Sequence, residues 1–261
     1  MLRAGSPLVS RWTIVAGQRM HARVGGARRL PADLPVILVH GLGVSSRYMG
    51  PTADRLAPFY RVYAPDLPGF GRSARPRQAL DVPGLADALH AWLRANRLER
   101  AAFLGNSMGC QVIVDLAARY PAVVARIILV APTIDRRARH PLVQIGRALW
   151  DMRGERLSLV PIVTRDYLAA GLIRDAVTFH YALQDRIEDK LPRVRVPALV
   201  IRGARDPIVP PRWAQEVTGL LPAGRLVVLP GAPHAANYSR APQLVATILP
   251  FLREPPGAPA P

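Results

Sequence analysis

The 261-residue sequence contains one cysteine, Cys110, and one lysine, Lys190. A single cysteine excludes an internal disulfide and a metal site built from several cysteines. No apolar run approaches the length that spans a membrane, and the first residues, 1–7, lack the apolar core of a secretory signal. We therefore expect a cytoplasmic protein without integral membrane association.

Two kinds of binding motif are also missing. The sequence has no glycine-rich phosphate loop of the Walker or dinucleotide type, so we expect no nucleotide and no other cofactor. His21, His90, His140 and His180 show no metal-ligand spacing. These histidines are predicted to be structural or exposed, and no metal is expected.

The formal net charge of +17 invites a nucleic-acid interpretation, because clustered cations bind phosphate. The arginines are instead spread through the whole chain, the densest run being 136–139, and no nucleic-acid-binding motif accompanies them. We expect no nucleic-acid partner. An anionic substrate or a membrane surface would still be attracted by this charge.

Half of the residues are apolar, and the chain is long enough for one large domain with a full core. Short apolar runs alternate with stretches of helical periodicity, a rhythm typical of a mostly parallel sheet with helices on both faces. Eight strands are expected, the first two as a hairpin over 9–24 that turns at Gly17-Gln18. The other six are expected at 36–39, 61–64, 101–104, 127–130, 198–201 and 225–229.

The rhythm breaks between 133 and 190, where only helical segments are expected, over 142–153, 157–170 and 172–186. We interpret residues 135–190 as a helical lid over the active edge of the sheet, with ordinary crossover helices as the alternative. Residues 1–134 and 191–253 would then form the core. The tail, 254–261, lacks apolar periodicity and is expected to be disordered.

One short motif organises the middle of the chain. Gly105-Asn106-Ser107-Met108-Gly109 lies between an apolar run and a helical stretch, as in a nucleophile elbow, where a tight strand-to-helix turn exposes the serine. The alternative is a glycine-bounded turn whose serine merely caps a helix. Cys110, one turn further on, is expected to be a buried helical residue.

An aspartate and a histidine follow at similar places, Asp206 and His234, each just past a predicted strand. A serine hydroxyl needs a base to take its proton, and the base needs a third group to hold its ring. Ser107, His234 and Asp206 supply these parts. Asp206 precedes Pro207, so the alternative to a catalytic role for Asp206 is a residue that opens an ordinary turn. The alternative for His234 is an exposed loop residue without a catalytic role.

The sequence resembles the α/β-hydrolase superfamily, in its serine-nucleophile branch, over nearly its whole length. The motifs that carry the resemblance are, in order, 40–43 (HGLG), 66–71 (DLPGFG), 105–109 (GNSMG), 203–206 (GARD) and 231–234 (GAPH). The resemblance implies an α/β-hydrolase fold with an eight-stranded sheet and a catalytic triad of Ser107, Asp206 and His234. The backbone N–H groups of Leu42 and Met108 would form the oxyanion hole.

The resemblance also gives expectations for neighbouring residues. His40 and Asp66 are expected to brace their loops rather than to react. Asp135 is a reserve for the triad acid, because some members of the superfamily carry the acid after the preceding strand. Gly41 and Asn106 are candidates for substrate binding.

A serine at position 107 disfavours the superfamily branches that use aspartate there. The motif around Ser107 looks like that of carbon–carbon bond hydrolases of aromatic catabolism, but those relatives carry tryptophan where Ala235 stands. They also use a lid arginine for the acid group of the substrate, for which Arg165 and Arg174 are candidates. We predict a carboxylic-ester or lactone hydrolase that acts on a small acyl substrate. An anionic substrate would suit the positive net charge of the protein. A carbon–carbon bond hydrolase is the alternative, and a non-catalytic small-ligand binder is a third possibility.

Overall fold

The computed structural model describes residues 8–26 and 34–255, and they form an eight-stranded sheet in the order β1-β2-β4-β3-β5-β6-β7-β8. Only β2 runs against its neighbours, and all other pairs from β3 onward are parallel. The strands are β1 (Val9–Val15), β2 (Gln18–Gly25), β3 (Val36–Val39), β4 (Val62–Pro65), β5 (Ala101–Asn106), β6 (Val124–Val130), β7 (Ala198–Gly203) and β8 (Gly224–Leu229). The predicted mostly parallel, eight-stranded sheet is confirmed.

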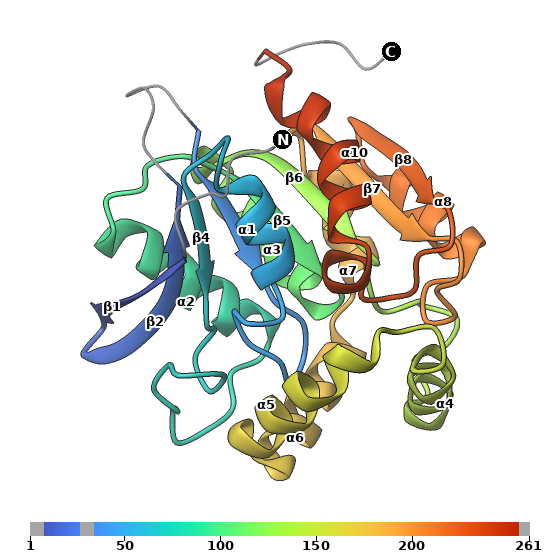
Figure 1. Cartoon of the computed structure of the whole chain (residues 1–261), viewed down its shortest axis with the longest axis horizontal. Coiled ribbons are helices and arrows are strands. Elements are labelled where there is room, and N and C mark those ends of the chain that lie inside the picture. Colours follow the sequence, from blue (N-terminus) through green and yellow to red (C-terminus); the bar gives the residue numbers. More distant parts are fainter. Residues whose placement is uncertain (1–7, 27–33, 256–261) are drawn as a thin grey trace.

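Helices cover both faces of this sheet (Figure 1), and each face has its own apolar core. The residues of β3 and β5 are buried throughout, which explains the unbroken apolar runs at 36–39 and 101–104. The helices are α1 (Gly50–Leu56), α2 (Val82–Ala95), α3 (Met108–Arg119), α4 (Pro141–Asp151), α5 (Val160–Ala170), α6 (Leu172–Gln184), α7 (Ile187–Lys190), α8 (Pro211–Leu220), α9 (Ala236–Ser239) and α10 (Ala241–Arg253). The cores contain α2, α3 and α8 on one face, and α1, α9 and α10 on the other.

Strand β6 begins three residues earlier than the sequence indicated, at Val124 rather than Ile127. Arg126 concealed this start, because a charged residue interrupts the apolar run. Its guanidinium donates hydrogen bonds to the backbone carbonyls of Phe251 and Glu254, at the end of α10. A buried strand can contain an arginine when its polar head finds such acceptors.

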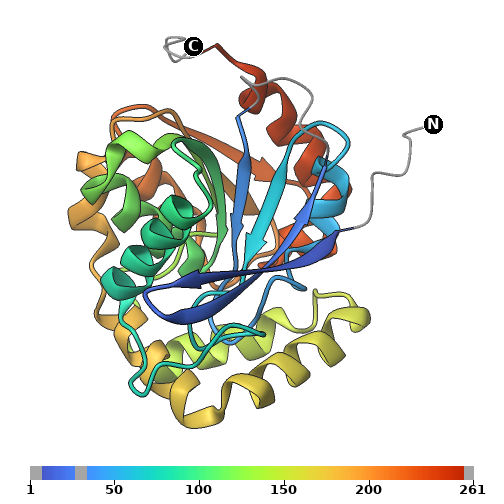
Figure 2. The ribbon, with the colours of Figure 1, turned by 90° about the vertical axis from the view of Figure 1, so that its left-hand side faces the viewer.

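The residues from 141 to 184, which we call the α4–α6 segment, lie between β6 and β7 in the sequence. Figures 1 and 2 show α5 and α6 together at one end of the molecule, beyond the end of the sheet. The predicted helical ranges agree with α4, α5 and α6 to within a few residues.

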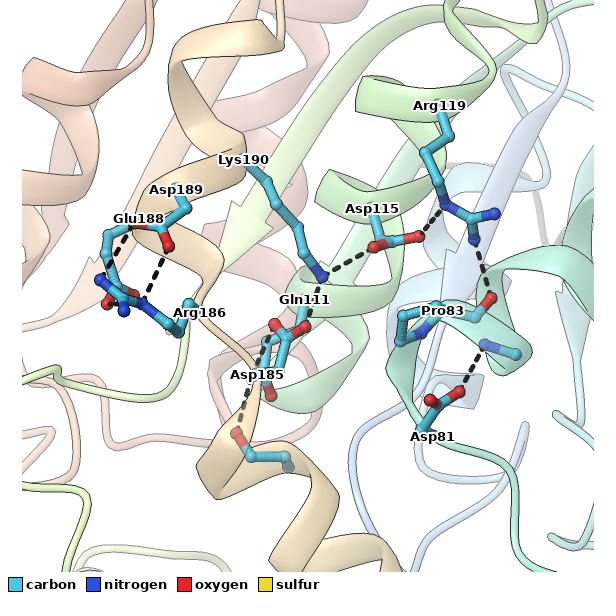
Figure 3. A network of polar contacts seen from close by, with 12 residues as sticks. Asp81, Pro83, Gln111, Asp115, Arg119, Asp185, Arg186, Glu188, Asp189 and Lys190 are labelled. Carbon is cyan, nitrogen blue, oxygen red and sulfur yellow. Dashed lines mark hydrogen bonds and ion pairs between the residues drawn. The ribbon is translucent and has the colours of Figure 1, made fainter.

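A polar network fixes the end of the α4–α6 segment to α3 (Figure 3). Lys190 forms ion pairs with Asp115 of α3, at 2.7 Å, and with Asp185. Gln111 of α3 donates hydrogen bonds to the carbonyl oxygen of Ala182, at 2.9 Å, and to Asp185. The only lysine of the sequence therefore stabilises a junction between this segment and the core.

Arg139 joins the two ends of the α4–α6 segment. Its guanidinium donates to the carbonyl oxygens of Leu183 and Asp185, both at 2.9 Å, and forms two hydrogen bonds with the carboxylate of Glu188. Arg139 precedes α4, whereas its acceptors lie at the end of α6 and beyond it. The entry and exit of the segment are thus held side by side.

Within the described ranges, no helix is both long enough and apolar enough to cross a membrane. Of the predicted tail, residues 256–261 lie outside the described residues. Glu254, at its start, pairs with Arg225 of β8.

Candidate active site

Ser107 occupies a one-residue turn between β5 and α3, with φ of 56° and ψ of −125°. A non-glycine residue rarely adopts a positive φ, and such strain persists only where the surroundings enforce it. The Ser107 N–H donates to the carbonyl oxygen of Val130 in β6, which ties the turn to the neighbouring strand. This is the geometry expected of a nucleophile elbow.

The two flanking glycines are required by close backbone packing. A Cβ atom on Gly105 would lie 2.7 Å from the backbone of Gly109, and one on Gly109 would lie 2.4 Å from the carbonyl oxygen of Val39. Both distances are far below ordinary contact, and in each case the obstacle is backbone. The residue pattern of the elbow therefore follows from sterics.

His234 and Asp206 lie in the loops that follow β8 and β7, and they are directly joined. Nδ1 of His234 lies 2.9 Å from Oδ2 of Asp206. The other oxygen of Asp206 accepts from the backbone N–H groups of Ile208, at 2.8 Å, and Val209, at 3.0 Å. Both residues are buried, so the carboxylate is held firmly against the imidazole.

Asp135, the reserve acid, is engaged elsewhere. Its carboxylate forms a two-pronged ion pair with Arg212 and a further pair with Arg147 at 3.3 Å. Of the two candidate acids, only Asp206 is hydrogen-bonded to His234.

A cavity of about 510 Å³ brings most of the predicted site residues together. Ser107 and His234 line it, as do both residues predicted for the oxyanion hole, Leu42 and Met108. Met108 is the first residue of α3, so its N–H has no acceptor within the helix. Gly41 and Asn106 line the cavity as well.

The two candidate arginines lie away from this cavity. Arg174 reaches the carbonyl oxygen of Pro76, at 2.6 Å, and packs against Gly69. Arg165 lies at a separate small hollow beside Arg47 and Asp166. Among the described residues, no arginine or lysine lines the large cavity, whereas Asp151, Glu155 and Asp175 do.

The hydroxyl of Ser107 has a neighbour that the sequence did not suggest, Thr133 in the loop after β6. The two hydroxyl oxygens are 3.5 Å apart. No hydrogen bond between the hydroxyl of Ser107 and the ring of His234 occurs in the described part of the chain, although both side chains line the same cavity.

The loop-bracing roles predicted for His40 and Asp66 are confirmed. Nε2 of His40 accepts from the N–H of Leu67, at 3.0 Å, so Nδ1 carries the proton and donates to the carbonyl oxygen of Gly41, at 2.8 Å. Burial lowers the pKa of His40, which favours this neutral form. Asp66 accepts from the N–H groups of Ser46, at 2.7 Å, and Arg72, at 2.8 Å.

Asn106 uses most of its hydrogen-bonding capacity inside the protein. Its amide nitrogen lies 3.1 Å from the carbonyl oxygen of His234 and 3.3 Å from that of Val130. Its amide oxygen accepts from the hydroxyl of Tyr48 at 2.7 Å. Asn106 therefore links the elbow to the histidine loop, and it also lines the cavity.

Two carboxylates near the end of α4 hold the histidine loop from the other side. Oδ1 of Asp151 accepts from the N–H of His234 at 3.1 Å, and Glu155 accepts from the N–H of Ala235 at 2.6 Å. Glu155 also accepts from the hydroxyl of Ser239. Neither residue belongs to a recognisable motif, so their contacts with the loop could not be found without the packing of α4.

These carboxylates change the titration of the histidine. Burial lowers the pKa of His234, but the ion pair with Asp206 and the negative charges of Asp151 and Glu155 outweigh it and raise this pKa to about 9. Burial raises the pKa of Asp151 above its ordinary value. The imidazole is therefore held more strongly in its protonated form than a free histidine.

Cys110 contributes no second nucleophile. It is completely buried, and burial raises the pKa of its thiol well above the ordinary value, which keeps it protonated. No cluster of three or more histidine, cysteine, aspartate or glutamate residues suited to a metal ion occurs within residues 8–26 and 34–255.

Comparison with known proteins places this geometry in a family. Residues 36–248 match the family model described as "Alpha/beta hydrolase family". The chain is 26% identical to the enol-lactonase of Burkholderia xenovorans LB400, whose structure superposes with a TM-score of 0.71 over 94% of this chain and all of the other.

Two curated relatives are longer proteins. The chain is 36% identical over 105 residues to the abhydrolase domain-containing protein abhd-5.2 of Caenorhabditis elegans, which covers 39% of this chain and 24% of the relative. It is 26% identical over 240 residues to the biotin biosynthesis bifunctional protein BioHC of Cellvibrio japonicus, covering 83% of this chain and 47% of the relative. The chain thus spans half or less of these two relatives. The match over residues 36–248 shows that the chain belongs to the alpha/beta hydrolase family, which confirms the resemblance seen in its sequence.

Proposed function

We propose that this hydrolase cleaves a carboxylic ester or lactone through an acyl-enzyme on Ser107, with His234 as general base and Asp206 as the acid that orients it. The observation that carries the proposal is the 2.9 Å contact between His234 and Asp206 at the cavity that Ser107 lines from a strained turn. A nucleophile, a base and an orienting acid are the three parts that this chemistry needs.

In the first half of the reaction, Oγ of Ser107 attacks the substrate carbonyl carbon, and its proton passes to Nε2 of His234. The imidazolium then protonates the departing alkoxide as the ester bond breaks. A water molecule, deprotonated by His234, then attacks the carbonyl carbon of the acyl-enzyme. As the bond from this carbon to Oγ of Ser107 breaks, the imidazolium returns the proton to Oγ and the carboxylic acid leaves. The hydroxyl and the ring must approach each other for these steps, as hydrogen bonds of free enzymes commonly do on binding substrate.

The N–H groups of Leu42 and Met108 are proposed to bind the oxyanion of the tetrahedral intermediate. Their residues lie on the cavity beside Ser107, and the start of α3 adds the positive end of a helix dipole. A single donor of this kind stabilises the transition state by about 3 kcal/mol in hydrolases.

We further propose that residues 135–190 act as the lid of this cavity. All three helices of the α4–α6 segment supply lining residues, among them Ile145, Tyr167 and Phe179. A mainly apolar cavity of this size suits a small acyl group. Its three carboxylate residues and the absence of a lining arginine or lysine in the described ranges favour a neutral substrate over the anionic one expected from net charge.

The carbon–carbon bond hydrolase is less well supported. The resemblance to carbon–carbon bond hydrolases implies a lid arginine that binds the acid group of the substrate. Both candidates, Arg165 and Arg174, instead contact other parts of the protein. The position after the histidine is Ala235 rather than tryptophan. Similarity to the enol-lactonase of Burkholderia xenovorans LB400 supports cleavage of a ring ester over cleavage of a carbon–carbon bond.

Hydrolysis of short p-nitrophenyl esters and simple lactones tests the proposal. Wild-type protein should turn over at least one of them, and Ser107→Ala should reduce the rate by roughly a thousandfold or more. A fluorophosphonate probe should label the wild type at Ser107, as located by peptide mass spectrometry. Ser158→Ala, which alters an exposed serine, is the matched control and should keep both activities.

Two results would count against the proposal. One is a wild type that neither hydrolyses the panel nor reacts with the probe. The other is a Ser107→Ala variant that keeps full activity. Faster cleavage of a vinylogous diketo acid than of any ester would favour the carbon–carbon bond hydrolase instead.

A further inference from the structure

The helices of the α4–α6 segment carry their apolar side chains on the outside. Twelve of the sixteen large hydrophobic residues that are exposed in the described part of the chain belong to residues 141–184. The most exposed are Leu157, at 88%, and Ile173, at 84%, followed by Leu142, Leu168, Leu172 and Trp150. We call these six residues the outer apolar face.

The buried side chains of the same helices are largely polar. In α4 the buried residues are Gln144 and Asp151. In α5 the buried residues are Asp166 and Ala170, and in α6 they are Asp175, Thr178, Ala182 and Leu183. A helix on the surface of a globular protein normally shows the opposite arrangement, with apolar residues inside and polar ones outside. Exposed apolar area of this extent marks a surface that binds something.

The charges on this surface all have one sign. Between residues 141 and 184, the exposed charged residues are Arg153, Arg156 and Arg165, the last of which borders the small hollow beside Arg47 and Asp166. The acidic residues of the same range are buried, apart from Glu155, which is half-buried and bonded to the histidine loop. A surface that combines exposed leucine, isoleucine and tryptophan with arginine is complementary to a layer of anionic lipids.

The cavity opens toward the same surface. Ile145, Met152 and Leu172 line the cavity and are also exposed, so they form part of its mouth. An apolar molecule leaving a lipid layer at this point would enter the cavity without crossing water.

We propose that the outer apolar face docks peripherally on an anionic membrane surface, with the mouth of the cavity toward the lipid. Binding involves insertion of the apolar side chains to the depth of the lipid headgroups, and the arginines pair with lipid phosphates. The docking does not depend on the reaction proposed for Ser107.

Flotation of the full-length protein with lipid vesicles tests the docking. The protein should float with vesicles that contain phosphatidylglycerol, and less with vesicles of phosphatidylcholine alone. Replacing Leu157 and Ile173 by serine should lower the partition coefficient about tenfold or more, because two aliphatic side chains no longer leave water. Arg153→Gln with Arg156→Gln should weaken binding to the anionic vesicles and reduce its salt dependence.

The matched control replaces exposed apolar residues elsewhere, Ile14 of β1 and Val228 of β8, by serine. It should bind vesicles as the wild type does. Circular dichroism and thermal unfolding of every variant show that a loss of binding is not a loss of fold.

Two outcomes would overturn the proposal. One is a wild type that does not float with either kind of vesicle. The other is light scattering that shows a dimer which the Leu157 and Ile173 substitutions dissociate, without any vesicle binding, because the face would then join two copies of the chain. Vesicle binding by a protein that fails to hydrolyse esters would leave the docking intact and remove only the proposed reaction.

Discussion

The side-chain amide of Asn106 donates a hydrogen bond to the backbone carbonyl of His234 over 3.1 Å, so the residue before the proposed nucleophile directly holds the loop of the proposed base. The same amide is oriented by the hydroxyl of Tyr48. One side chain therefore joins two positions that are 128 residues apart in the sequence.

Asn106→Ala should lower kcat about tenfold to a hundredfold, because a base displaced by an ångström takes a proton much less efficiently. KM should change less, since the contact joins two parts of the protein. Steady-state kinetics on the best ester of the panel measures both. Asn96→Ala, at the end of α2 and away from the cavity, is the control. A fall in kcat that is equal in both variants would argue against a positioning role.

The pH dependence of kcat/KM should report the raised pKa of His234. The imidazole acts as a base only when neutral, so activity should rise with pH and reach half its maximum above 6.5, the ordinary value for histidine. Asp151→Asn removes one of the negative charges that raise this pKa, and should move the midpoint to lower pH. Asp54→Asn, on the exposed side of α1, should leave the midpoint in place. A midpoint that is unchanged in Asp151→Asn would contradict the assignment of this charge.

Gly109→Ala should destabilise the protein, by about 1–3 kcal/mol as for other overpacked interiors, because its Cβ would meet the backbone of β3 at 2.4 Å. Gly219→Ala provides the matched control. Gly219 lies in α8 with open space around it, so the same substitution there should stabilise the protein by about 0.5–1 kcal/mol. Urea unfolding measures both. Equal stability of the two variants would exclude the steric explanation of the elbow.

Asp175→Asn should increase stability near neutral pH. The carboxylate of Asp175 is buried, and none of its oxygens has a hydrogen-bond donor among the described residues. Burial raises its pKa to about 6, against the attraction of Arg174. The folded state therefore binds this proton more tightly than the unfolded chain, whose carboxyl titrates near 3.8, and the free energy of unfolding falls as pH rises between these values.

Calorimetry near pH 8 should show Asp175→Asn more stable than the wild type by on the order of 1 kcal/mol, with the two converging near pH 4. Asp115→Asn is a control in which the same substitution should have the opposite effect on stability. Its carboxylate pairs with Arg119 and Lys190, so its loss should destabilise the protein. An Asp175→Asn variant that is less stable than the wild type near pH 8 would mean that its carboxylate has a stabilising partner.

The fold could be predicted from the sequence because its central strands are buried on both faces and contain unbroken apolar runs, as in residues 36–39. The hairpin was recognisable from alternation, but its turn lies at Ala16 and Gly17, which both adopt positive φ, one residue before the predicted Gly17-Gln18. The start of β6 could not be found, since Arg126 reaches carbonyl groups of α10 that are more than a hundred residues away.

The candidate site was predictable to the extent that it rests on short motifs at strand ends. The contact between Asp206 and His234 follows from such motifs, and so do the glycines around Ser107. The roles of Asp151, Glu155 and Tyr48 depend on how helices pack over the sheet, which no local pattern encodes. For the same reason, the orientation of Arg165 and Arg174 away from the cavity became visible only in three dimensions.

Arg139 has a consequence for how this protein can diversify. One guanidinium holds together the two ends of the α4–α6 segment, which is more than forty residues long. The distance between these ends is therefore set independently of the sequence between them. The helices of this segment can lengthen, shorten or be exchanged while the sheet and the candidate site keep their structure. A fold whose insertion is fixed at both ends in this way can acquire new substrate specificities when that one insertion is replaced.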